Sequence, residues 1–225
     1  MADDGPRYSW AEMPAVDDGR LDAPAFRSNI GPILAALTER LAGVAGHAID
    51  IGCGSGQHTA AFARNFPALT WWPTDPDPRH RQSADAWTKH FRLSNVMPAA
   101  AIDAAADDWR LGADGRGPGG DIAVIWSANV VHITAWAVTV GMIGGAGRYL
   151  KPGGRLLIYG PFSRDGVHNA DSNAAFDRSL KTQDPSWGVR DIADIEALGK
   201  ATGLTLEEVI GMPANNRILV FCRDS

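Results

Sequence analysis

The stretch AIDIGCGSGQHTAAF, from Ala48 to Phe62, places three glycines within five positions, between an apolar run and a run with helical spacing. This order predicts a strand, a tight turn and a helix N-terminus, where backbone N–H groups converge without a Cβ in the way. In open α/β sheets, ligands bind at the carboxyl ends of the strands, which is where such a turn lies. The stretch therefore predicts an α/β fold with a ligand, such as an adenine nucleoside, at this turn.

Strand-like and helix-like segments alternate along the rest of the chain, which is typical of a mostly parallel sheet. The run DIAVIWSA, residues 121–128, is continuously apolar, as expected for a central strand buried on both faces. The last two strand-like segments are separated only by PANN, which indicates a hairpin. Strands are predicted at 47–52, 69–75, 96–103, 121–128, 155–160, 204–212 and 217–222, and helices at 26–43, 57–66, 77–91, 131–150 and 191–203.

We therefore expect a Rossmann-like, seven-stranded, mostly parallel sheet with helices on both faces and an antiparallel last strand. The sequence has no internal repeat that would indicate a repeat architecture. Residues 1–225 are interpreted as a single domain, in which the polar N-terminal segment 1–28 could close over the site.

Composition restricts the kind of ligand. A formal charge of −5 over 225 residues supplies no broad cationic surface for nucleic-acid phosphates, so a small neutral or cationic ligand is expected. The two cysteines form no disulfide framework, and no histidine pair has metal-binding spacing, so we predict no metal and a cytoplasmic location. The apolar region 122–145 is interrupted by polar side chains and is interpreted as a buried strand and helix, not a membrane span.

The spacing of the glycine turn separates classes of nucleotide ligand. Gly52, Gly54 and Gly56 form GxGxG, whereas a dinucleotide-binding GxGxxG needs its last glycine where Gln57 stands. No lysine follows the glycines, as it would in the phosphate loop of a nucleotide hydrolase. The turn therefore favours a nucleoside ligand that has no phosphates.

Carboxylates lie at the ends of three successive predicted strands near this turn. Asp50 could contact a ligand amino group or order the N–H groups of the loop. Asp75 could accept from both ribose hydroxyls, and Asp103 from an exocyclic adenine amine. S-adenosylmethionine fits this set, because it carries ribose, adenine and a sulfonium cation but no phosphate.

With AIDIGCGSG, the acidic strand end PTD and YLKPGGRLLIYG, the sequence resembles the class I S-adenosylmethionine-dependent methyltransferases. More narrowly, LTWWPTDPDP, NVVHI, KPGGRLLIYGPF, DPSWGVRD and MPANN resemble the domain of unknown function 938 family, also called methyltransferase-like 26. In that family a basic residue stands on either side of the asparagine before PIL, whereas here Ser28 and Ile30 flank it.

The resemblance implies S-adenosylmethionine as cofactor and S-adenosylhomocysteine as product. The residues expected to bind the cofactor are Asn29, Asp50, Gly52, Cys53, Gly54, Gly56, Asp75, Pro76, Ile102, Asp103, Ser127 and Asn129.

The end of the strand 121–128 is expected to face the reacting groups. Methyl transfer depends mainly on alignment, and a general base helps only when the acceptor must lose a proton. His132 is the candidate catalytic base, and the alternative is a partly buried histidine that is hydrogen-bonded to a backbone carbonyl. Asn129 is not followed by two prolines and an aromatic residue, which argues against nucleic-acid bases as acceptors.

Aromatic and amide side chains are the candidates for acceptor binding. Trp136, Tyr159 and Phe162 could contact a flat acceptor, with core packing as the alternative. Asn215 and Asn216 could contact a polar acceptor or serve only as turn residues.

The predicted function is methyl transfer to a small molecule. A non-catalytic S-adenosylmethionine-binding partner protein and a less favoured nicotinamide oxidoreductase are the alternatives, and the oligomeric state is left open.

Overall fold

A computed structural model describes residues 15–16, 18–113 and 117–224. Its six strands form one sheet in the order β2-β1-β3-β4-β6-β5. The pairs β1–β2, β1–β3 and β3–β4 are parallel, and β6 is antiparallel to both of its neighbours. The mostly parallel sheet and its antiparallel last strand are therefore confirmed. The strands are β1 (Gly46–Ile51), β2 (Leu69–Thr74), β3 (Ile122–Ala128), β4 (Leu150–Gly160), β5 (Leu204–Gly211) and β6 (Arg217–Arg223).

The predicted count of seven strands is wrong, because the segment 96–103 forms no continuous strand. It runs beside β2 but pairs with it only at two isolated parallel bridges, Trp71 to Val96 and Thr74 to Ala100. Pro73 in β2 lacks the N–H that would donate to the segment, and the segment bonds β2 only irregularly, through the N–H groups of Met97 and Ala100, so the pairing is interrupted.

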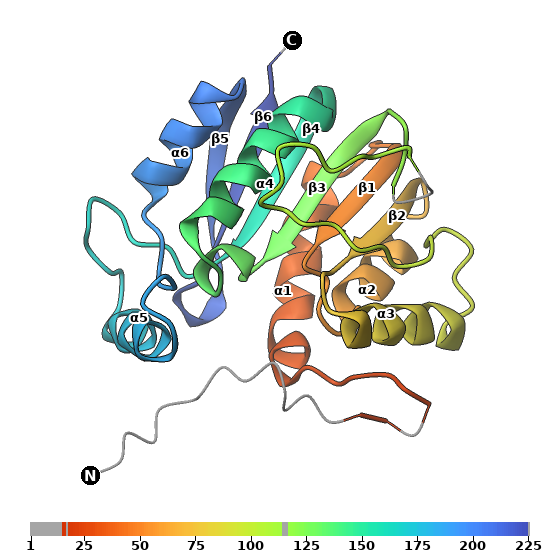
Figure 1. The fold of residues 1–225 in the computed structure, drawn as a ribbon, viewed down its shortest axis with the longest axis horizontal. Helices are drawn as coiled ribbons and strands as arrows, with labels where there is room; N and C mark the ends of the chain where they lie inside the picture. Colours follow the sequence, from red (N-terminus) through yellow and green to blue (C-terminus); the bar gives the residue numbers. More distant parts are fainter. Residues whose placement is uncertain (1–14, 17, 114–116, 225) are drawn as a thin grey trace.

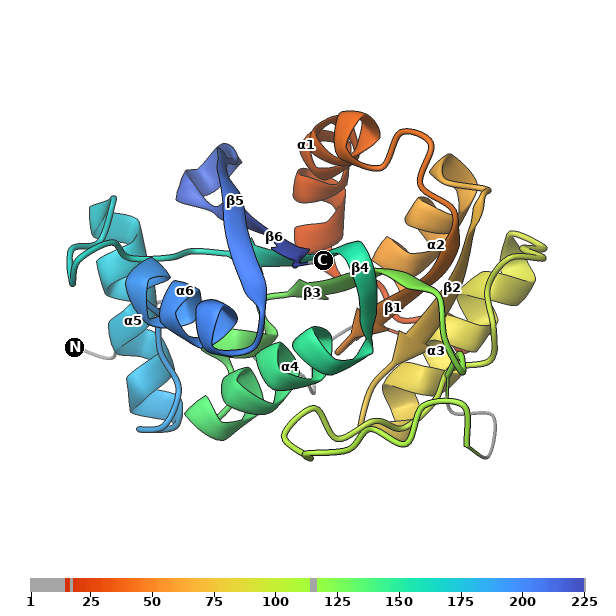
Figure 2. The same cartoon turned by 90° about the horizontal axis from the view of Figure 1, so that it is seen from above.

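Six helices accompany the sheet in the part of the chain that the structure describes. Figure 2 shows α1 and α2 on one face of the sheet and α4 and α6 on the other, which confirms the prediction of helices on both faces. The helix α5 was not predicted, because it lies within a long polar region. The helices are α1 (Pro24–Arg40), α2 (Gln57–Asn65), α3 (Pro78–His90), α4 (Trp136–Tyr149), α5 (Asp171–Gln183) and α6 (Ile192–Ala201).

The helix predicted at 131–150 begins five residues later than expected, at Trp136. Before it, Val130–His132 form a 3-10 turn, which Asn129 starts with a left-handed backbone (φ 62°). Glycine inside α4 permits close packing: a Cβ on Gly145 would lie 2.2 Å from a ring carbon of Trp109. Among the described residues, no helix combines the length and the apolar character needed to span a membrane.

The carboxyl ends of the parallel strands lie at one edge of the molecule, the lower edge in Figure 1, together with α5 and the start of α1. The hairpin between β5 and β6 turns at the same edge through the 3-10 turn Pro213–Asn215. Of the N-terminal segment 1–28, only residues 15–16 and 18–28 belong to the described part, and Leu21 is buried there. Candidate ligand-binding segments from both halves of the sequence therefore meet at this edge.

Candidate functional site

The turn between β1 and α2 requires glycine at three alternate positions. Gly52, Gly54 and Gly56 have φ values of 68°, 54° and 80°. These values lie in the left-handed region, where a residue with a Cβ is strained. The spacing GxGxG therefore follows from the backbone path of the turn.

Packing distinguishes the middle glycine from the outer two. A Cβ on Gly52 would lie 2.4 Å from Val130 Cγ2, and one on Gly56 would lie 2.4 Å from the Cα atom of Ala84. A Cβ on Gly54 would meet no atom of the described residues within 4 Å. The outer glycines thus allow close packing, whereas Gly54 leaves open space beside its backbone for a ligand.

Asp75 follows β2 and lies against this turn. One of its carboxylate oxygens, Oδ2, accepts from the Gly54 N–H at 3.0 Å. The other, Oδ1, accepts from the Asp77 N–H at 2.9 Å and lies 3.1 Å from Nδ1 of His80. A carboxylate offers about four acceptor positions, so one remains for a ligand hydroxyl in this arrangement. A second ribose contact, as the sequence predicts, requires the release of one of the existing bonds.

Asp50 is buried in β1, and the hydrogen bonds of its carboxylate and its carbonyl join β1 to neighbouring elements. Its carboxylate accepts from the Thr59 hydroxyl in α2, and its backbone carbonyl accepts from Thr74 Oγ1. Burial raises the pKa of Asp50 to about 7, the Thr59 hydrogen bond lowers it, and the Asp75 charge raises it further. The side chain joins β1 to α2 beneath the glycine turn.

The other predicted cofactor residues near these strands differ in accessibility. Cys53 is buried, its N–H donates to the Thr74 carbonyl, and burial raises the pKa of its thiol well above the usual value. Pro76 is exposed beside Asp75. Ile102 is part of the core, and exposed Asp103 accepts from the Ala105 N–H at 2.9 Å.

The end of β3 lies between the glycine turn and β4. Ser127 is fully buried, and its hydroxyl donates to the Ile51 carbonyl at 3.1 Å, which ties the ends of β1 and β3 together. The Asn129 N–H donates to the Tyr159 carbonyl of β4 at 2.8 Å, and the Asn129 carbonyl accepts from the His132 N–H. These bonds hold the Asn129 side chain at the strand edge.

A partly open cavity of about 320 Å³ lies at this edge, between α1, α5, the ends of β3 and β4, and the β5–β6 hairpin. Four predicted site residues line it together: Asn29, Asn129, Tyr159 and Asn216. The cavity contains no charged side chain among its described lining residues. Sequence reasoning missed Asn173 and Phe176, which also line it, because α5 was not predicted.

His132 lies beneath this cavity rather than in its lining. The side chain is fully buried, and its ring packs edge-to-face against Phe162 with the centroids 4.8 Å apart. Nδ1 accepts from the Arg190 N–H at 3.3 Å, which places the proton of the neutral ring on Nε2. Burial lowers the pKa of His132 to about 3. In this arrangement the imidazole is a neutral donor, which does not favour a role as base.

The other candidate acceptor residues separate into different environments. Phe162 is fully buried in the core, as the packing alternative predicts. Trp136 is 36% exposed and stacks with Arg190 beside a different surface groove. The Asn215 carbonyl accepts from Asn173 Nδ2 at 3.0 Å and so fixes the hairpin to α5.

Two polar residues after the glycine turn organise the site in ways that sequence reasoning missed. Gln57 Oε1 accepts from the Ala23 N–H at 2.7 Å, and Nε2 donates to Asp22, so the side chain holds the N-terminal segment. His58 Nε2 lies 2.9 Å from Oδ1 of Asn29. Burial lowers the pKa of His58 to about 4, so the ring is neutral, and because an amide oxygen only accepts, Nε2 carries the proton and donates this bond. The sequence signal that could have identified them is their position directly after the glycine turn, in the first turn of α2.

Residues 20–223 match the family that is described as protein of unknown function (DUF938). The chain belongs to the DUF938 family. The resemblance to this family that was inferred from the sequence is therefore confirmed for nearly the whole chain.

Several solved structures resemble this DUF938 protein. An O-methyltransferase family protein from Burkholderia thailandensis is 21% identical with a TM-score of 0.73, over 87% of this chain and 56% of that one. The mitomycin 7-O-methyltransferase MmcR is 21% identical with a TM-score of 0.71, over 88% of this chain and 54% of that one. A methyltransferase of calicheamicin biosynthesis, solved with S-adenosylhomocysteine, is 19% identical with a TM-score of 0.61, over 85% of this chain and 54% of that one.

These comparisons establish the fold of the DUF938 protein as that of the class I methyltransferases, with six strands instead of seven. The chain spans little more than half the length of the three solved structures.

Proposed function

We propose that this DUF938 protein is an S-adenosylmethionine-dependent methyltransferase that acts on a small-molecule acceptor, with residues 1–225 as one catalytic domain in the cytoplasm. The observation that carries the proposal is the open space beside Gly54, next to the buried carboxylate of Asp75. A phosphate-free nucleoside can approach the backbone there, and a carboxylate suits a ribose hydroxyl. Related folds solved with S-adenosylhomocysteine support this choice of ligand.

The glycine turn 52–56, Asp75 and Asn129 would hold the cofactor, which supplies an electrophilic methyl group when bound. Asn129 contributes to both parts of the site, because it lies between β3 and Val130, which packs against Gly52 of the glycine turn, and it also lines the cavity. An acceptor in that cavity would therefore lie next to the cofactor. A cavity of about 320 Å³, instead of a flat surface patch, favours an enzyme over a non-catalytic binding protein.

The mechanism that we propose depends on positioning. In-line displacement requires the acceptor atom to be aligned with the methyl carbon, and such alignment can supply a large part of the rate enhancement. The cavity walls from α1, α5 and the hairpin restrict the orientation of the acceptor and exclude part of the solvent. His132 is a positioning residue in this proposal, since it joins the end of β3 to the backbone at Gly188 and Arg190.

Calorimetric titration with S-adenosylmethionine, S-adenosylhomocysteine and NADH tests the proposal. We expect micromolar binding of the first two, no binding of NADH, and at least tenfold weaker binding to Asp75→Asn. Asp191→Asn is the matched control, because Asp191 also accepts three hydrogen bonds, from Ser163 Oγ and the N–H groups of Gly166 and Ala193, away from the cavity. Tighter binding of NADH, or no binding of either adenosyl ligand, would reject the proposed function.

A further inference from the structure

The cavity at the ends of β3 and β4 has a polarity that restricts the acceptor. Its described lining residues offer amide, hydroxyl, aromatic, thioether and aliphatic groups, and none of them carries a charge. We propose that the acceptor is an electrically neutral molecule that presents both a hydrogen-bond acceptor and a hydroxyl or amide donor. This inference rests on the proposed function, because it specifies the substrate class of the same site.

The orientation of the Asn29 amide follows from its neighbour in α2. The neutral His58 ring donates from Nε2 to Asn29 Oδ1 at 2.9 Å. His58 itself is held among aromatic rings, with Phe26 at 5.1 Å and Phe62 at 5.9 Å between centroids. With its oxygen occupied, Asn29 offers the Nδ2 hydrogens to the cavity. This wall of the cavity therefore supplies a hydrogen-bond donor.

Two asparagines on the opposite side have the reverse orientation. Asn173 Nδ2 donates to Asn169 Oδ1 at 2.7 Å and to the Asn215 carbonyl at 3.0 Å, which uses both of its hydrogens. Asn216 Nδ2 donates to the Pro213 carbonyl at 3.3 Å and to the Ala214 carbonyl at 3.5 Å. The remaining polar atom of each side chain is the amide oxygen. The α5 and hairpin walls therefore supply hydrogen-bond acceptors, which require a donor on the ligand.

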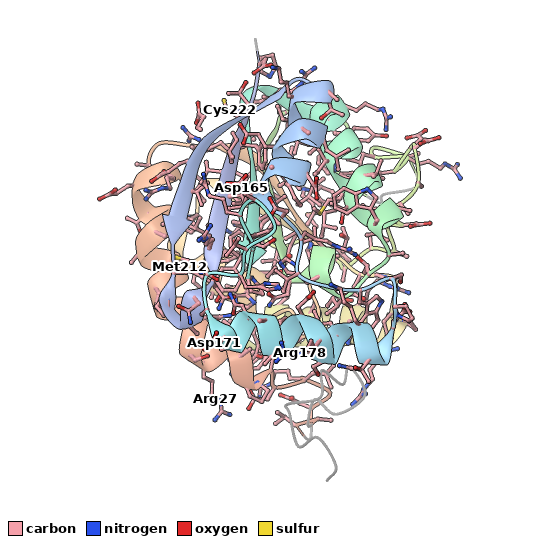
Figure 3. All side chains as sticks on the ribbon, turned by 90° about the vertical axis from the view of Figure 1, so that its left-hand side faces the viewer. Arg27, Asp165, Asp171, Arg178, Met212 and Cys222 are labelled. Carbon is pink, nitrogen blue, oxygen red and sulfur yellow. The ribbon has the colours of Figure 1, made fainter. Side chains whose placement is uncertain are left out.

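Charged side chains of these elements lie outside the cavity. Figure 3 shows Met212, which lines the cavity, near the start of α5 at Asp171, and Arg27 extending into solvent from α1. Arg27 is 74% exposed and pairs with Asp22. A charged acceptor would lose hydration on entering the cavity without meeting an opposite charge on any described lining residue, and this penalty is large compared with that for a neutral group. The walls therefore discriminate against carboxylates, phosphates and ammonium groups.

Matched fragment sets test the inference directly. Each set keeps one hydroxyphenyl ring and varies its substituent as carboxamide, hydroxymethyl, carboxylate or aminomethyl, so that only charge and polarity change. Binding to the wild-type protein is measured by saturation-transfer NMR, with saturating S-adenosylhomocysteine. Ala25→Trp fills the cavity from α1, and Ala35→Trp is the control, since Ala35 is exposed on the same helix but does not line the cavity.

We expect the carboxamide and hydroxymethyl members to bind at least tenfold more tightly than their ionised partners. This binding should be lost in Ala25→Trp and kept in Ala35→Trp. Equal or tighter binding of an ionised member, or the absence of any fragment that depends on Ala25, would overturn the inference. Failure of S-adenosylhomocysteine to bind in the calorimetric titration would instead reject the proposed function, so the two failures are distinguishable.

Discussion

The substitution Gly54→Ala separates ligand binding at the glycine turn from folding. Gly54 has φ 54°, so alanine is strained there by about 1–2 kcal/mol. Its Cβ would meet no described atom within 4 Å, so no steric clash adds to the strain. For a chain of this length, each kcal/mol lowers the Tm by about 2–4 °C. We therefore expect a modest loss of stability.

Gly43→Ala provides the control for this strain. Gly43 follows α1, away from the cavity, with φ 71° and equally open surroundings among the described residues. Both variants should therefore lose similar stability in thermal unfolding. Only Gly54→Ala places a Cβ where the ligand approaches the backbone, so only this variant should bind S-adenosylhomocysteine more weakly, by at least about tenfold or 1.4 kcal/mol.

Calorimetry below the Tm of both variants measures this difference. Wild-type affinity in Gly54→Ala would refute the assignment of the open space beside Gly54 to the cofactor. Equal weakening in both variants would show that strain acts through stability and not through ligand contact. A Tm loss in Gly54→Ala much larger than in Gly43→Ala would contradict the absence of steric overlap at this position.

Three further predictions concern buried polar groups. His132 has a native pKa of about 3 and an unfolded value near 6.5, so wild type should lose stability as the pH falls through this range, and His132→Gln should show a flatter profile in urea unfolding. Asp50 has a native pKa of about 7, above its unfolded value, so its contribution is lost as the pH rises from about 4 to 7. Asp50→Asn should therefore gain Tm relative to wild type at pH 8 but not at pH 4, and an equal gain at both would contradict this. Gln57→Ala should cost about 1–2 kcal/mol and speed proteolysis near Ala23, whose N–H loses its acceptor; unchanged cleavage would argue against this tether.

The sequence was most informative where backbone geometry restricts residue choice. The positive φ values at Gly52, Gly54 and Gly56 require glycine, so the turn and its flanking strand and helix were predictable. The absence of the seventh strand was not, because the run 96–103 has strand-like composition while Pro73 of β2 removes a donor from the pairing. Whether a strand-like segment pairs depends on which other segment becomes its neighbour. A local sequence pattern does not contain this information.

The cavity was only partly predictable for a similar reason. Asn129 and Tyr159 follow directly from the strand ends, and both line the cavity. Asn173 lies on α5, whose sequence is mostly polar, and its part in the site depends on tertiary contacts with the hairpin. His132 has the residue type of a base at the expected position, but only the structure shows its burial and its bond from the Arg190 N–H.

These contacts show how the carboxyl ends of β3 and β4 shape the cavity together. Asn129 turns the chain with a left-handed backbone, and the hydrogen bond from its N–H to the Tyr159 carbonyl of β4 fixes the direction in which its side chain leaves the sheet. The buried His132 then fixes the backbone at Gly188 and Arg190 below the cavity. Because the imidazole is neutral and Nδ1 accepts from the Arg190 N–H, the geometry favours the positioning role that we propose for His132 over proton transfer. A methyl acceptor bound here would accordingly need to be nucleophilic by its own chemistry, or to lose its proton to solvent as the methyl group is transferred.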